Sequence, residues 1–158
     1  ASNVNAFAAR YEHNGRAETA FIQGKDYQVG QGGDEVDLVI GDAYAKQIPG
    51  IDWERVWPLL AFNASRRTDD YLALGYVASD GDHGDYDNRM ASGSSTLAFA
   101  YEDWCSAQVA AGLGETDTAE ELLQRSENWQ NVWDASLAGD GFSGFVRAKN
   151  SCGAFSTS

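Results

Sequence analysis

Residues 94–133 constrain the fold most, because two apolar repeats of helical spacing lie on either side of a glycine. The first repeat ends at Leu113, directly before Gly114, and its inward side is expected to hold Leu97, Tyr101, Trp104 or Cys105, Gln108 and Val109. A glycine in this place favours the left-handed turn that ends a helix. The second repeat starts at Thr116 or Thr118, resembles a capping arrangement with Glu120 and Glu121, and is expected to bury Leu122, Leu123, Trp129 and Val132 or Trp133. We therefore predict an αα-hairpin whose tryptophans are buried.

Further helices are predicted upstream. Val4, Phe7, Ala8 and Tyr11 share one face of a helix over residues 3–11. Asp34 is expected to cap a helix that continues to about Lys46, and Asp52 to cap another that follows the break at Pro49 and Gly50. One short helical turn is expected over residues 71–74.

The remaining stretches lack apolar periodicity. Residues 12–33 contain five glycines and are predicted to form a long loop, and residues 79–93 are rich in Asp, Gly, Asn and Ser and predict an exposed loop. The glycine-rich tail after Asp134 predicts loops with a short strand pair at 142–148. We expect a single domain over residues 1–158, mainly α, with αα-hairpins and long Gly/Asp-rich loops.

The charge balance excludes some partners. With 24 acidic and 11 basic side chains, the formal net charge of -13 repels phosphate backbones and anionic lipid surfaces, so no nucleic acid is expected as a partner. The longest apolar runs, such as residues 57–62, are too short for a bilayer, so no membrane partner is expected either. The sequence begins at Ala1 without a basic-then-apolar leader, as does a mature secreted protein, and we predict an extracellular location.

Two features bear on the secretory pathway. The cysteines, Cys105 and Cys152, are compatible with one disulfide that ties the tail to a helix and equally with two free thiols. The triplet that starts at Asn63 is a sequon for N-glycosylation.

Several collinear motifs resemble glycoside hydrolase family 92, the exo-α-mannosidases, particularly its fungal members. The stretch TLAFAYEDWC at 96–105 is similar to the family segment with a Leu-Glu-Tyr-x-Tyr-x-Asp-Trp/Tyr core. Other stretches follow in the family's order: YEH at 11–13, QGG at 31–33, VIGDAYAK at 39–46, LGYV at 74–77, RSENWQNVWD at 125–134 and GFSGFVRAK at 141–149. The resemblance implies a β-sandwich followed by an (α/α) barrel in the family, of which this sequence resembles a helical portion of the barrel.

The resemblance also implies calcium-dependent, inverting chemistry with a general acid and a carboxylate base. The family's acid position falls near Phe21, where Glu18 is the neighbouring glutamate and the candidate acid. The family's Gly-Asn-Asp-Asp base segment is not in this sequence, and Ala98 stands where the family commonly has glutamate. No catalysis by this chain alone is therefore expected, and the calcium site is expected to be incomplete.

Substrate and metal candidates follow from residue chemistry. Trp53, Tyr76 and Tyr86 are the aromatic side chains expected to be exposed and able to stack on a sugar, and Asp103 is a further substrate-binding candidate. No metal ligands are predicted: the carboxylates around Asp80 lack EF-hand spacing, and His13 and His83 are isolated.

Three functions remain open at this point. The chain is a truncated, secreted relative of the α-mannosidases without independent hydrolase activity, or a non-catalytic protein that binds mannose-type glycans or a receptor, or one chain of a processed, multi-chain α-mannosidase. Partial helical architecture exposes apolar helix faces, so self-association or a partner chain is expected.

Overall fold

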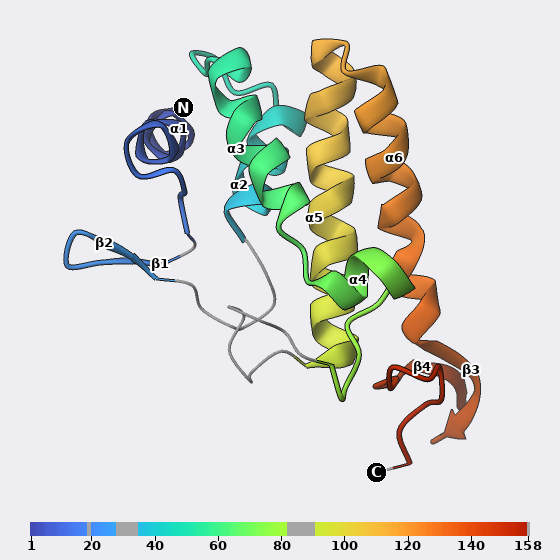
Figure 1. Ribbon diagram of the computed structural model, residues 1–158. Coiled ribbons are helices and arrows are strands. Elements are labelled where there is room, and N and C mark those ends of the chain that lie inside the picture. Colours follow the sequence, from blue (N-terminus) through green and yellow to red (C-terminus); the bar gives the residue numbers. More distant parts are fainter. Residues whose placement is uncertain (19, 28–34, 82–90, 158) are drawn as a thin grey trace.

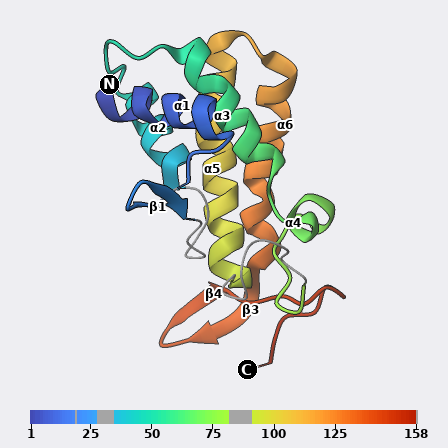
Figure 2. The same ribbon diagram turned by 60° about the vertical axis from the view of Figure 1, so that its left-hand side comes forward.

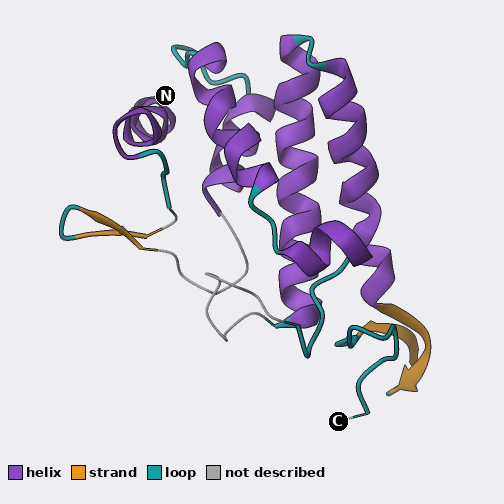
Figure 3. Cartoon of the chain, in the orientation of Figure 1, coloured by secondary structure: helices purple, strands orange, loops and turns teal. Residues whose placement is uncertain are grey.

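The computed structural model describes residues 1–18, 20–27, 35–81 and 91–157. Helices form the body and the strands are confined to two hairpins (Figures 1 and 3). The elements are α1 (Ser2–Asn14), β1 (Ala20–Ile22), β2 (Lys25–Tyr27), α2 (Glu35–Ala45), α3 (Trp53–Ser65), α4 (Asp69–Leu74), α5 (Ser92–Leu113), α6 (Thr116–Ser126), the 3-10 helix η1 (Glu127–Val132), β3 (Trp133–Gly139) and β4 (Phe142–Val146). The mainly α fold predicted from the sequence is confirmed.

The α5–α6 hairpin is the predicted one. Helix α5 ends at Leu113, and Gly114 adopts a left-handed conformation with φ of 82° that closes the turn. Helix α6 begins at Thr116, but no side chain caps its first turn, so the predicted capping arrangement is wrong. The two helices lie side by side in both views of the molecule (Figures 1 and 2).

Helices α2 and α3 pack against α5, and α1 packs against α3. Asp52 caps α3 as predicted, since its Oδ1 accepts a hydrogen bond from the Arg55 backbone N–H at 3.1 Å. The predicted cap at Asp34 lies outside the described residues. The main core lies between α1, α2, α3 and α5 and includes Val4, Ala8, Val36, Ile40, Val56, Leu59, Leu60 and Val109.

Helices α2 and α5 approach closely because glycines lie in their contact. A Cβ on Gly41 would lie 2.6 Å from the Cys105 Cβ. On α5, the Tyr44 hydroxyl lies directly against Gly112. A Cβ built on Gly112 would lie 1.5 Å from the Tyr44 hydroxyl oxygen. These two positions therefore require glycine for the observed packing.

Both β-hairpins differ from the sequence-based expectation. Strands β1 and β2 pair within the segment predicted as loop, around a turn in which Gln23 and Gly24 have positive φ angles of 52° and 77°. Strand β4 pairs with β3, which precedes it, across the turn at Asp140 and Gly141. The strand pair near the C-terminus exists, but one of its strands starts at Trp133 rather than downstream of Phe142.

The buried side of α5 agrees with the prediction only in part: Cys105 and Val109 are buried as expected, whereas the residues before them on the predicted side are not. Phe99 and Val109 are buried together with Glu102 and Asp103. Leu97, Tyr101 and Trp104 lie on the outer side and are 38%, 55% and 42% exposed, and Trp129 and Trp133 are 40% and 42% exposed. The prediction that these tryptophans are buried is wrong for the chain as described, because no described element covers the outer side of α5.

None of the described helices combines the length and the hydrophobicity needed to cross a membrane.

Candidate functional site

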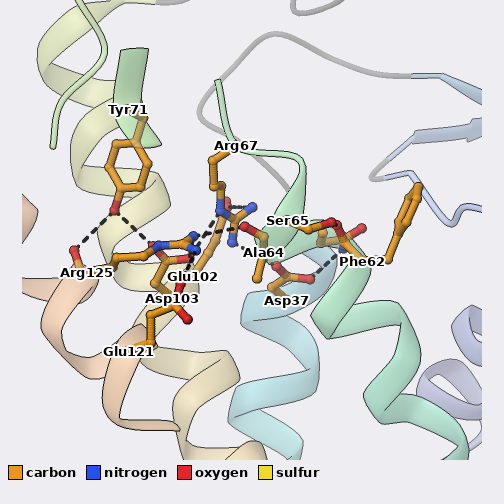
Figure 4. A network of polar contacts seen from close by, with 11 residues as sticks. Asp37, Phe62, Ala64, Ser65, Arg67, Tyr71, Glu102, Asp103, Glu121 and Arg125 are labelled. Atoms are coloured by element: carbon orange, nitrogen blue, oxygen red, sulfur yellow. Dashed lines mark hydrogen bonds and ion pairs between the residues drawn. The ribbon is translucent and has the colours of Figure 1, made fainter. Parts of the chain in front are cut away.

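A network of buried charges joins α2, α5 and α6 to the segment that follows α3 (Figure 4). Arg67 lies between α3 and α4, and its side chain is fully buried. Its guanidinium forms ion pairs with Asp37 of α2 at 3.2 Å, with Glu102 of α5 at 2.8 Å and with Asp103 of α5 at 3.3 Å. One arginine thus connects α2 and α5 to the turn after α3.

Arg125 of α6 meets the same cluster from the other side. Its Nη2 and Nε donate to the two oxygens of Asp103 at 2.8 and 3.0 Å, a bidentate arrangement. Nη2 also donates to the Ala64 carbonyl of α3 at 3.0 Å. The Tyr71 hydroxyl donates to Asp103 Oδ2 at 3.0 Å, and burial, followed by the nearby Asp103 charge, raises the pKa of Tyr71.

Asn63 of α3 also belongs to the network. Its side chain is 3% exposed, and Nδ2 donates to Asp37 Oδ1 at 2.7 Å. The nitrogen to which a glycan would be attached is thus buried in this structure, and glycosylation of Asn63 stays a prediction.

The network is built for structure rather than for contact with a ligand. Asp37, Glu102 and Asp103 are fully buried, and each forms an ion pair with Arg67 or Arg125. Asp103, the predicted substrate-binding residue, lies inside this network rather than at a surface (Figure 4). Buried and paired carboxylates cannot meet a sugar without opening the helices.

The described residues do not fit a calcium site. The carboxylate cluster around Arg67 holds guanidinium groups where a cation would bind, and within the described ranges no three His, Cys, Asp or Glu side chains are grouped to hold a metal ion. The Asp80 carboxylate accepts hydrogen bonds from the Ser151 backbone and hydroxyl at 2.6 and 3.1 Å, which lowers its pKa. The acidic positions at 82–88 lie outside the described residues.

Glu18, the predicted acid, lies in a second group of charges. Its side chain is 3% exposed, Arg66 Nη1 donates to its Oε1 at 3.4 Å, and Arg16 lies 3.9 Å from the same oxygen. Arg10 donates to the Glu18 backbone carbonyl at 3.0 Å. These contacts are typical of a structural ion pair, and the catalytic role of Glu18 stays a prediction.

The predicted aromatic ligand contacts have different surroundings. Trp53 is half-buried, packs edge-on against Tyr44 with ring centroids 5.0 Å apart, and lines a hollow of about 440 Å³ beside the α2–α3 turn. Tyr76 is buried and its hydroxyl donates to the Asn150 carbonyl at 2.9 Å, so its predicted exposure is wrong. Tyr86 lies outside the described residues. Trp53, Tyr76, Asp103 and Glu18 thus have separate partners and do not form one site.

The cysteines are both free. Cys105 is buried between α5 and α2, whereas Cys152 is exposed in the C-terminal tail, so the disulfide that the sequence allowed is not formed. Burial, with a smaller contribution from the Asp37 charge, raises the pKa of the Cys105 thiol to about 12.

The residues missed by the sequence analysis form an open aromatic groove. Tyr101 and Trp104 of α5 stack with ring centroids 6.0 Å apart and an interplanar angle of 16°. They line a groove of about 320 Å³, whose other lining residues are Leu97, Ala100, Ser126, Glu127 and Trp129. The helical spacing of Leu97, Tyr101 and Trp104 indicated a shared face of the helix, and the sequence analysis placed that face in the core of this chain.

Comparison with known proteins identifies the fold. The family model described as glycosyl hydrolase family 92 catalytic domain matches residues 1–158. An uncharacterized secreted glycosidase of the fungus Arthroderma benhamiae is 30% identical over an alignment of 138 residues, and the match covers 75% of this chain and 18% of that protein.

Two solved structures are similar in fold. A family 92 α-mannosidase of Bacteroides thetaiotaomicron, in complex with mannoimidazole, has a TM-score of 0.77 and 26% identity over 98% of this chain and 19% of its own. An inverting mannosidase of family 92 from the same bacterium has a TM-score of 0.74 and 21% identity over 98% of this chain and 20% of its own. The chain spans about a fifth of the length of these relatives, and it belongs to glycosyl hydrolase family 92.

Proposed function

We propose that these 158 residues are part of a secreted catalytic domain that hydrolyses α-mannosides, and that the chain has no hydrolase activity alone. The match of the catalytic-domain family to the full length of the chain carries the proposal. An α-mannosidase structure with 26% identity and a secreted fungal glycosidase with 30% identity support the substrate class and the location.

The need for further residues rests on the described carboxylates. Glycoside hydrolysis by an inverting enzyme uses two carboxyl groups that face the sugar with room for a water molecule. Asp37, Glu102 and Asp103 are enclosed and paired with arginines, and Glu18 is 3% exposed. Without a carboxylate base that activates water, about a hundred- to ten-thousand-fold of rate acceleration is lost.

Hydrolysis of nitrophenyl α-mannoside, with and without added calcium, tests both parts of the proposal. The isolated chain should release no nitrophenol above the uncatalysed rate. A chimera in which this chain replaces the matched stretch of the Arthroderma glycosidase should hydrolyse the substrate. Activity of the isolated chain would contradict its proposed inactivity, and a folded chimera that cleaves other glycosides but not α-mannosides would contradict the substrate class.

A two-chain enzyme is the second candidate, because the exposed aromatic groove on α5 could receive a separate chain as readily as a segment of the same one. Mass spectrometry of the native material distinguishes the two, since a stoichiometric second chain with family 92 sequence is expected only for the two-chain enzyme. A glycan array probed with the isolated chain tests a purely glycan-binding function, for which mannose-type glycans are the expected ligands.

A further inference from the structure

A small hollow lies between the end of α1 and the β1–β2 hairpin. It has a volume of about 330 Å³ and is lined by Asn14, Arg16, Gly24 and Lys25. Helix α1 ends at Asn14, and Gly15 adopts a left-handed conformation with φ of 72°, which turns the chain towards the hairpin (Figure 1). The turn of the hairpin then brings Lys25 back to the same hollow as Arg16.

The lining of this hollow is basic although the chain is strongly acidic. The sequence has 24 acidic and 11 basic side chains, yet among the described residues that line the hollow two are basic and none is acidic. Elsewhere in the described fold, basic side chains lie close to a carboxylate, as Lys46 does to Asp42 at 2.7 Å and Arg147 to Asp134 at 2.6 Å. The two cations of the hollow therefore differ from these paired side chains.

Neither cation of the hollow has a carboxylate at hydrogen-bond distance within the described part of the chain. The Arg16 guanidinium lies 3.9 Å from Glu18 Oε1, whereas Arg66 approaches the same oxygen to 3.4 Å. Lys25 forms no ion pair with a described residue. Both side chains are exposed, Arg16 by 52%, so their charges are accessible to a ligand from solution.

The surroundings of the hollow add further positive charge. Arg16 and Arg66 lie beside the carboxylate of Glu18, and Arg10 donates to the Glu18 backbone carbonyl at 3.0 Å. One carboxylate thus lies among three guanidinium groups, and Lys25 adds a fourth positive charge on the hairpin. Positive charge gathered in a concave site raises the local concentration of anions.

We propose that this hollow binds a single tetrahedral oxyanion, phosphate or sulfate, as the free ion or as an ester on an uncharged molecule. Arg16 offers several N–H donors in a planar fork and Lys25 a compact charge, and both types of donor complement the oxygens of such a group. Two cations match the charge of a dianion better than that of chloride or a carboxylate. An extended polyanion does not fit, because the net charge of -13 repels it beyond the hollow.

Nuclear magnetic resonance of the isotope-labelled chain tests the site. Titration with sodium phosphate, at an ionic strength kept constant with sodium chloride, should shift the backbone amide signals of residues 14–16 and 24–25 until they saturate. Sodium sulfate should shift the same signals. Lys25→Gln and Arg16→Gln should each weaken the affinity by about threefold to tenfold, because charged hydrogen bonds at an exposed site are partly screened.

Two further variants separate a specific site from general attraction. Lys46→Gln changes the net charge by the same amount as Lys25→Gln, but Lys46 pairs with Asp42 and does not line the hollow, so the affinity should stay as in the unchanged chain. Arg16→Lys keeps the charge without the planar fork and should bind more tightly than Arg16→Gln. If Arg16→Gln does not fold, Lys25→Gln alone measures the loss, because Lys25 forms no ion pair with a described residue.

Methyl phosphate, titrated beside phosphate, distinguishes the two sources of the oxyanion. Tighter binding of methyl phosphate assigns the site to an esterified molecule, and tighter binding of phosphate assigns it to the free ion. Three results would overturn the proposal: no saturable shifts with phosphate, sulfate or methyl phosphate, the same shifts with chloride alone, or an equal loss of affinity in Lys25→Gln and Lys46→Gln. The last two would reduce the effect to screening of the whole chain's charge.

Discussion

Replacing Arg67 with methionine tests whether the buried charge network holds the helices together. The side chain of Arg67 is fully buried and pairs with three carboxylates at 2.8 to 3.3 Å. Methionine retains much of the volume but removes the charge. In the variant, Arg125 is the remaining guanidinium of the network, and it pairs with Asp103 rather than with Asp37 or Glu102.

The expected cost is large compared with the stability of a domain. Breaking a buried ion pair by removing one partner costs about 3–5 kcal/mol, because the remaining charge is left without compensation. The free energy of unfolding of a typical domain is about 5–15 kcal/mol, so Arg67→Met should remove a large fraction of the stability. The loss should shrink at acidic pH, because Asp37 and Glu102 of the variant can take up protons once Arg67 no longer pairs with them.

Urea unfolding followed by tryptophan fluorescence at pH 5 and pH 7 measures both effects. Arg55→Met is the matched control: Arg55 pairs with Glu12 at 2.5 Å, but the two side chains are 39% and 48% exposed, and solvent screens such a pair so that its loss should change the stability little. If Arg67→Met does not fold, the double variant Arg67→Met/Glu102→Gln can be measured in its place. It removes one of the uncompensated charges and should therefore recover part of the lost stability. Equal costs for Arg67→Met and Arg55→Met would refute the reasoning.

Three further predictions follow from individual contacts. A thiol reagent at pH 8 should modify Cys152 rapidly and Cys105 only on unfolding, because Cys105 is buried and its pKa is raised to about 12; rapid modification of both would contradict the packing. Gly41→Ala should lower the free energy of unfolding by about 1–3 kcal/mol, despite the better helix propensity of alanine, and an unchanged urea midpoint would show that α2 and α5 can separate. The hydrogen bonds from Ser136 and the ion pair with Arg147 lower the pKa of Asp134. The stabilisation of the folded state by these contacts should therefore be complete above pH 4 and lost as the pH falls through the lowered pKa. Asp134→Asn should therefore shift the urea midpoint at pH 7 and progressively less below pH 4; a shift independent of pH would rule out the charge as its cause.

The helices could be predicted because residues close in the sequence determine where they begin and end. Gly114 and Asp52 end and begin helices through backbone and side-chain contacts within a few residues. Strands β1 and β2 have three residues each, which is too short for an alternating pattern to stand out. Strand β3 was missed because Trp133 continues the helical spacing of the segment before it.

The buried face of α5 could be predicted only in part, because the helix carries apolar residues on more than one side. Periodicity identified Leu97, Tyr101 and Trp104 as a contact surface, but the contact is not made by any described element of the chain. The burial of Asp103 could not be predicted for a related reason: charged residues are expected at surfaces or in active sites, and the arginines that pair with Asp103 come from positions 36 and 22 residues away.

The motif that carries the family resemblance has two separate structural roles. At about 100° per residue, Tyr101 and Trp104 lie on one side of a helix and Glu102 and Asp103 on the other. The acidic pair points to Arg67 and Arg125 and joins α5 to its neighbours within the chain, while the aromatic pair stacks on the outer side. The motif therefore serves packing within the chain through its acidic pair, while its aromatic pair lies at the surface of the described fold.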